Sequence, residues 1–186
     1  MWAYLERELR LVARSWEVLA SVLLIESALG FVFAETYVGG LVASNFVAVA
    51  IYSYVQILRE EEVGTLDGLR LLNQPEKVVA AKFFALFSTS LMTSLLYSAV
   101  HFAVPMKPPD LWLVPPTATY FSAASTASAL LSTAAKSGVT TSMTLTAALI
   151  LGYSTSVAAG RVDPAVFSMP LAIFLVLLAL SRNLIQ

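Results

Sequence analysis

The chain has 186 residues, of which 58% are hydrophobic and 12% are charged, about half the charged fraction of an average soluble domain. A net charge of -1 excludes the basic face of a nucleic-acid-binding protein, and the lack of cysteine excludes disulfides and thiolate sites. A single histidine, His101, excludes a multi-histidine metal site. The apolar residues form several long runs, and the mean hydropathy is +0.78. These features predict an all-α, polytopic membrane protein with one domain over residues 1–186.

Residues 1–16 interleave charges with apolar side chains, so no secretory signal peptide is predicted. Leu5, Leu9 and Val12 share one side of a helix, and the charged residues Glu6, Arg7, Arg10 and Arg14 lie largely elsewhere. This spacing predicts an amphipathic elbow helix on the membrane surface, where arginines favour anionic lipids. The alternative is that these residues are the first turns of a long first span.

Six segments are long enough to cross a bilayer core, which takes about 20 residues. They are residues 17–34, 37–58, 78–104, 117–135, 139–159 and 164–180. Between the third and fourth segments, the prolines of residues 105–116 predict a loop, because proline cannot continue a helix. The expected fold is a six-transmembrane-helix bundle.

The basic residues predict the orientation of this bundle. With the N-terminus inside, nine of the 11 Lys and Arg residues fall on the inner side and only Lys107 and Arg161 on the outer side. This bias predicts a multi-pass protein of the plasma (cytoplasmic) membrane with both termini in the cytoplasm. Lys82 falls slightly within the third span, from which its side chain is expected to snorkel to the inner surface.

The fourth and fifth spans are crowded with Ala, Ser and Thr, as in residues 120–138 and 140–148. Small residues let helices approach closely, and their hydroxyls form hydrogen bonds within or between helices. Two interpretations follow, tight packing within the bundle and a polar transport path.

A charged block at residues 59–77 separates the second and third apolar runs. Gly64 interrupts the preceding helix, Thr65 can cap a new one, and Pro75 ends it. The new helix has three leucines on one face and two charges off it, namely Leu66, Leu69, Leu72, Asp67 and Arg70. The pattern predicts about two turns of amphipathic helix packed against the bundle or a partner, although a solvated loop helix would have a similar sequence.

This block resembles the coupling-helix region of ABC-2-type exporter permeases. The resemblance is closer to CcmB, the membrane subunit of the haem-exporter ABC transporter of cytochrome c maturation. It rests on Glu60, Glu61 and Glu62, the Gly64-Thr-Leu-Asp67 core, the leucine run and the polar turn before Lys77. The Lys136-Ser-Gly138 junction and the end of the last span are also similar to that family.

The resemblance implies a transporter subunit that is not itself an enzyme. The chain has no Gly-x-x-x-x-Gly-Lys-Ser/Thr loop, so ATP would be bound by a separate, CcmA-like ATPase that docks on the block from Glu60 to Leu72. A permease homodimer and a CcmC-like haem-handling membrane protein are the other partners implied. The implied function is export, or remodelling of a haem complex, driven by ATP hydrolysis. Alternatives are an ABC-2 permease for an unrelated substrate and a non-catalytic membrane scaffold.

Two intramembrane polar residues are candidate site residues. Glu26 lies near the middle of the first span, where a charge costs at least about 2.5–3.5 kcal/mol, so its side chain should face protein or water. It has either an assembly or functional role, or the role of a protonated residue bonded to a neighbouring hydroxyl. His101, near the outer end of the third span, is either a haem ligand or a structural residue. An intramembrane enzyme is disfavoured, because these two candidates are expected at different depths.

Overall fold

The computed structural model describes residues 2–14, 16–53, 75–104 and 106–134, together with residues 168, 171, 172, 174–176, 178 and 179. Its elements are α1 (Trp2–Arg14), α2 (Trp16–Val32), α3 (Tyr37–Ser53), α6 (Pro75–Ala103), the 3-10 turn η2 (Leu111–Leu113) and α7 (Val114–Ala134). Within these ranges there is no strand. The predicted all-α class is therefore confirmed for the part of the chain that the structure describes.

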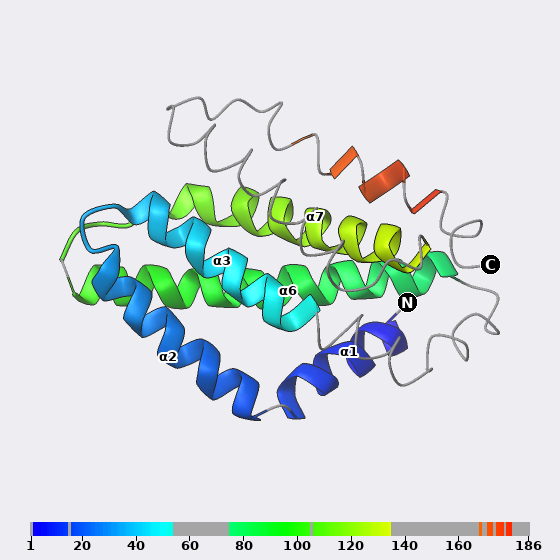
Figure 1. Ribbon diagram of the computed structural model, residues 1–186, viewed down its shortest axis with the longest axis horizontal. Coiled ribbons are helices and arrows are strands. Elements are labelled where there is room, and N and C mark those ends of the chain that lie inside the picture. The colour runs from blue at the N-terminus through cyan, green and yellow to red at the C-terminus, as the bar shows by residue number, and fades with distance from the viewer. Residues whose placement is uncertain are drawn as a thin grey trace.

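α6 is the central helix of the molecule (Figure 1). It runs antiparallel to both α3 and α7, which also pack on each other, and it contacts all four of the other helices. α2 forms a hairpin with α3 and also packs on α6. α1 and α2 are joined in a V, and α1 packs along the N-terminal half of α6. The C-terminal residues add Phe174, whose ring stacks on Phe83 of α6 at a centroid distance of 4.2 Å.

The four helices α2, α3, α6 and α7 overlap the first four predicted spans. α2 ends at Val32, before the predicted end at residue 34, the predicted end of the second span lies outside the described residues, and α6 and α7 start earlier than predicted. α6 begins at Pro75, three residues before the predicted start. α7 begins at Val114, so the prediction of a loop through residue 116 was wrong: Pro115 and Pro116 belong to the first turn of α7. Both shifts have one cause, since N–H groups in a first turn have no acceptor within the helix and proline sacrifices nothing there.

The later predictions fall largely outside the described residues. The coupling-helix block lies outside them up to residue 74, as does the whole fifth span. The prediction that the cytoplasmic loop extends to residue 77 was wrong, because residues 75–77 belong to the first turn of α6. Of the sixth span, the residues described between 168 and 179 are helical. One helix in the described part, Glu76–Ala103, is long and apolar enough to cross a membrane, and Ala20–Val32 and Tyr37–Tyr52 are shorter apolar helical stretches.

Two glycines bring α2 and α3 close to α6. A methyl group at Gly30 of α2 would overlap the side chain of Val100, and one at Gly40 of α3 would overlap the hydroxyl of Tyr97. Both neighbours belong to the C-terminal half of α6. The missing side chains therefore set the spacing of the three helices around Tyr97, as small residues commonly do at helix interfaces in membranes.

Candidate functional site

One face of α6 is polar and points into the bundle. Five residues at intervals of three and four positions share this face, and none is more than 2% exposed. We call them the inner polar stripe: Ser90, Ser94, Tyr97, Ser98 and His101. Neither a serine nor a histidine is usually placed in a core without partners, so the contacts of each residue decide what the stripe can do.

Asn45 of α3 links its helix to the middle of this stripe. Its Nδ2 donates to Ser94 Oγ and to the Leu41 carbonyl oxygen, each at 2.8 Å. Its Oδ1 accepts a hydrogen bond from Ser90 Oγ. Because Asn45 is fully buried, these bonds satisfy an amide that would otherwise be costly to remove from water. They also fix the register of α3 against α6.

Towards the end of α6 the stripe becomes aromatic. The Tyr37 and Ser98 hydroxyls are 2.8 Å apart. Since Ser98 Oγ donates to the Ser94 carbonyl at 2.7 Å, Tyr37 is the donor of the pair. The His101 ring lies against two tyrosine rings, with centroid distances of 5.1 Å to Tyr37 and 5.9 Å to Tyr97.

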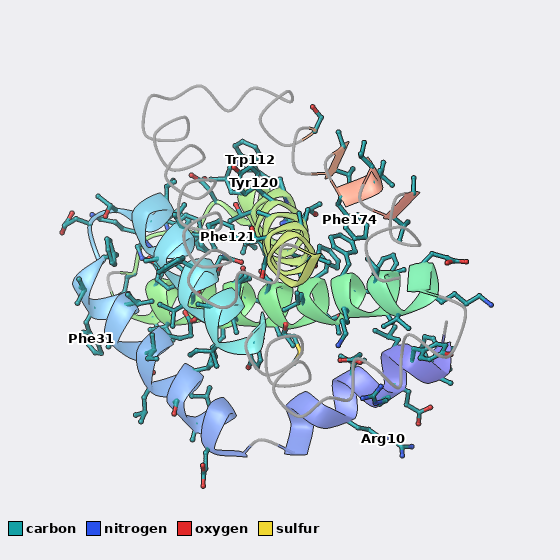
Figure 2. The ribbon with its side chains drawn as sticks, turned by 45° about the vertical axis from the view of Figure 1, so that its right-hand side comes forward. Arg10, Phe31, Trp112, Tyr120, Phe121 and Phe174 are labelled. Atoms are coloured by element: carbon teal, nitrogen blue, oxygen red, sulfur yellow. The ribbon has the colours of Figure 1, made fainter. Side chains whose placement is uncertain are left out.

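The opposite face of α6 is apolar and points away from the bundle. Phe84, Met92, Leu95 and Phe102 lie on one stripe of the helix and are 42–71% exposed. The same holds for α2, where Phe31 projects outward (Figure 2). In its C-terminal half, the polarity of α6 is thus the reverse of a helix on the surface of a water-soluble protein, which turns its apolar face inward. In the N-terminal half, Val79, Phe83 and Leu86 are buried in the core.

Glu26 faces the protein interior, as expected, and is fully buried. Ser44 of α3 lies beside its carboxyl group, and the Glu26 charge reaches the hydroxyl groups of Tyr97 and Tyr52. The approach of Ser44 to the Glu26 carboxyl group falls outside regular hydrogen-bond geometry, and the side-chain oxygens of Glu26, Ser44 and Tyr97 have no other hydrogen-bond partner in the described part of the chain. These three residues, from α2, α3 and α6, are called the Glu26 cluster below.

The surroundings of His101 favour the structural interpretation over that of a haem ligand. An axial ligand needs a ring nitrogen that faces a space as wide as a porphyrin, whereas His101 is 2% exposed and packed between Tyr37 and Tyr97. Its Nδ1 has no hydrogen-bond partner among the described residues. This packing favours the structural role. Through Tyr97, which belongs to the Glu26 cluster, His101 also adjoins that cluster.

The hydroxyl-rich helix α7 favours the packing interpretation in its described part. Ser122, Ser125, Thr126 and Ser128 are all buried. Thr126 donates to the Ser122 carbonyl at 2.8 Å and Ser128 to the Ala124 carbonyl at 2.7 Å, so these hydroxyls bond within their own helix.

At the N-terminal end of α6, Lys82 is buried beneath α1. Its Nζ lies 3.4 Å from Oε2 of Glu8, and both side chains are less than 5% exposed. The prediction that Lys82 snorkels to the surface was therefore wrong, because α1 covers this side chain and supplies it with a carboxylate. This ion pair attaches the elbow segment to the central helix.

At the other end of the bundle, Lys107 forms an exposed ion pair. Its Nζ lies 2.7 Å from Oε2 of Glu35, in the turn between α2 and α3. The hydrogen bond from Lys107, and then its charge, hold the pKa of Glu35 below the usual carboxyl value. Since both side chains are largely in solvent, this pair contributes little to stability.

The sequence-predicted site residues thus divide into two groups. The proposed ATPase-docking residues from Glu60 to Leu72 lie outside the described residues. Glu26 and His101 lie inside the bundle, on α2 and α6. Asn45 and Tyr97 were missed, although serines spaced by three and four positions along the third span were a visible sign of a polar face.

Comparison with known proteins gives no family assignment. The chain matches no protein-family model, and no curated protein or solved structure is significantly similar to it. What is established is an all-helical protein in its described part, with one helix that meets the length and hydropathy of a membrane span.

Proposed function

We propose that the chain is a multi-pass membrane protein and the permease subunit of an ABC transporter whose ATPase is a separate chain. The observation that carries the membrane location is the reversed polarity of α6 in its C-terminal half. In water, the large apolar side chains of its outer stripe would be solvated, which costs roughly 25 cal/mol per Å² of exposed apolar surface. In lipid that cost disappears, and buried hydroxyl and amide groups hold the helices together.

The charges support an orientation with the α1 end inside. In the described part of the chain, Arg7, Arg10, Lys77 and Lys82 belong to α1 and to the first turns of α6. Beyond the other end of α6 the described chain has Lys107, which is paired with Glu35. Loops rich in Lys and Arg stay in the cytoplasm, so α1 and the start of α6 are assigned to that side.

The docking of a motor subunit is proposed at the same end. The charged block at residues 59–77 joins α3 to α6, and the end of α3 and the start of α6 lie on the side of the bundle where α1 packs (Figure 1). Closure of two ATPase subunits would press on this block. Because the last residues of this block, from Pro75 on, already belong to the first turn of α6, such a movement would be transmitted directly to the central helix.

The process that ATP hydrolysis would drive is proposed from the sequence resemblance to CcmB. It is export, or remodelling of a haem-handling complex in cytochrome c maturation, with a permease homodimer at the centre. An ABC-2-type permease for another substrate has the same mechanics. The enclosed position of His101 supports a version in which this side chain does not ligate haem.

The experiment is affinity purification of the tagged chain in mild detergent from its native host, with identification and assay of the proteins that accompany it. We expect a stoichiometric ATPase, lost when Asp67 and Arg70 are both changed to alanine. The matched control changes Asp110 and Lys107 to alanine, which alters the same charges at the opposite end and should retain the ATPase. A preparation without any ATPase contradicts the proposal and favours a membrane scaffold.

A further inference from the structure

Among the residues that the structure describes, the Glu26 cluster has the largest group of buried polar atoms without a hydrogen-bond partner. Asn45 and the serines of the inner polar stripe use their hydrogen-bonding capacity on one another or on helix carbonyls. Both carboxylate oxygens of Glu26, and the hydroxyls of Ser44 and Tyr97, have no such partner among the described residues. A buried carboxylate without a counter-charge costs several kcal/mol, so the charged form of Glu26 needs a cation.

The backbone around the cluster is arranged to bring these oxygens together. Gly40 lies one turn before Ser44 on α3 and abuts the Tyr97 hydroxyl, which allows the phenol to reach the face of α3 that carries Ser44. Gly30 lies one turn after Glu26 on α2 and packs on Val100 of α6. Three helices therefore contribute four side-chain oxygens to this region of the interior: two from the Glu26 carboxyl group and two from the hydroxyl groups of Ser44 and Tyr97.

The charge of the cluster selects the class of ligand. One carboxylate is neutralised by one monovalent cation, whereas a divalent ion would leave a buried positive charge. The described part of the chain has no group of three His, Cys, Asp or Glu residues that would suit a transition metal. Within that part, the titratable side chains that the Glu26 charge reaches are Tyr52 from α3 and Tyr97 from α6, both neutral near pH 7.

We propose that Glu26, Ser44 and Tyr97 form a buried binding site for a small monovalent cation, either H⁺ or Na⁺, held by oxygen atoms. A proton turns the carboxyl into a hydrogen-bond donor to one of the two hydroxyl oxygens. A sodium ion is instead ligated by the carboxylate and both hydroxyl groups. The site is independent of an ATPase, so it stands or falls separately from the proposed permease function.

The test is modification of the purified full-length protein by dicyclohexylcarbodiimide. A protonated carboxyl group in apolar surroundings adds across a C=N bond of this reagent, and the product rearranges to a stable N-acylurea. Adducts are located by mass spectrometry across a pH series, in NaCl or in KCl of equal ionic strength. We expect an adduct on Glu26 that disappears as the pH rises, and none in the Glu26→Gln variant. Protection by Na⁺ but not by K⁺ identifies sodium as the ligand, and equal labelling in the two salts identifies the proton.

The hydroxyl groups are tested by Ser44→Ala and Tyr97→Phe, with Ser122→Ala as the control for loss of a buried, unpartnered hydroxyl on α7. A hydroxyl that stabilises the carboxylate lowers the pH at which labelling is half-complete. Its loss should raise that midpoint by about one pH unit for a proton site, or weaken Na⁺ protection about tenfold for a sodium site. Two results overturn the proposal: no adduct on Glu26 at any pH, or labelling that is unchanged in both cluster variants. Gel filtration confirms that each variant is folded.

Discussion

The two faces of α6 differ in a way that the composition of the helix does not reveal. Ser90, Ser94 and Ser98 are buried, while Met92 and Leu95, within the same two turns, are exposed. In water the free energy of such a helix would favour the opposite rotation about its axis. The comparison teaches that the medium around a helix is indicated by which residue types face outward. The number of apolar residues in the helix indicates it much less.

The largest effect is expected on the outer face. Met92→Lys places a charge on the 71% exposed side chain near the middle of α6. If lipid surrounds this face, the change costs about 2.5–3.5 kcal/mol of insertion free energy. The measurement is the fraction of protein inserted in the membrane, with Met92→Leu as the neutral control. An unaltered inserted fraction, together with higher solubility, would show that water covers this face.

On the inner face, Gly40→Ala should destabilise by about 1–3 kcal/mol, because the new methyl group would overlap the Tyr97 hydroxyl and approach Phe33 Cβ within 2.8 Å. The neighbouring Gly39→Ala is the control, since its methyl group would approach Phe33 and Thr36 no closer than 3.3 Å. Both are measured by unfolding in mixed detergent and SDS micelles. Equal effects of the two changes would mean that α3 and α6 are not as close as described.

A smaller effect is expected for Asn45→Leu, which removes the amide that joins α3 to Ser90 and Ser94. Hydrogen bonds between membrane helices contribute about 1 kcal/mol. The control is Ser88→Ala, because Ser88 Oγ donates only to the Phe84 carbonyl of its own helix. The same unfolding assay applies, and a leucine variant as stable as the parent would remove Asn45 from the list of helix-linking residues.

The smallest effect is expected for Lys107→Met, and it should depend on pH. Lys107 keeps the pKa of Glu35 lower in the folded than in the unfolded protein. The pair therefore adds stability above the usual carboxyl pKa, and this contribution is lost as the pH falls through the lowered value. Thermal unfolding of parent and variant should differ slightly at pH 7, and the difference should vanish as the pH falls below the lowered pKa of Glu35. A difference that grows towards low pH would contradict this assignment.

The sequence predicted those features that depend on local patterns. Apolar runs gave the four helices α2, α3, α6 and α7, and the charge at Glu26 correctly indicated a side chain turned towards protein. Pairings between distant segments were not predictable in this way. Two examples are the pairs Glu8–Lys82 and Asn45–Ser90, whose members are 74 and 45 positions apart. The local sequence around each residue does not indicate which distant residue it contacts. Pro115 and Pro116 were misassigned because proline disrupts a helix interior but suits a first turn.

The candidate site was predicted in part for the same reason. Glu26 and His101 stand out in a sequence as polar residues in apolar runs. Ser44 and Tyr97 belong to residue types that are common in any membrane helix, so only the packing of α2 and α3 on α6 marks them. The proposed ATPase-docking segment depends on the sequence resemblance, because it lies outside the described residues.

The most direct test of the membrane assignment uses single cysteines, which the chain accepts without prior changes because it has none. Lys77→Cys, Leu95→Cys and Met106→Cys mark the start, the outer face and the far end of α6, and each parent side chain is exposed. With a membrane-impermeant maleimide, we expect Met106→Cys to react in intact cells and Lys77→Cys only after permeabilisation. Leu95→Cys should react in neither case until the protein is denatured. Labelling of all three in intact cells, or of Leu95→Cys in folded protein, would contradict a membrane-spanning α6.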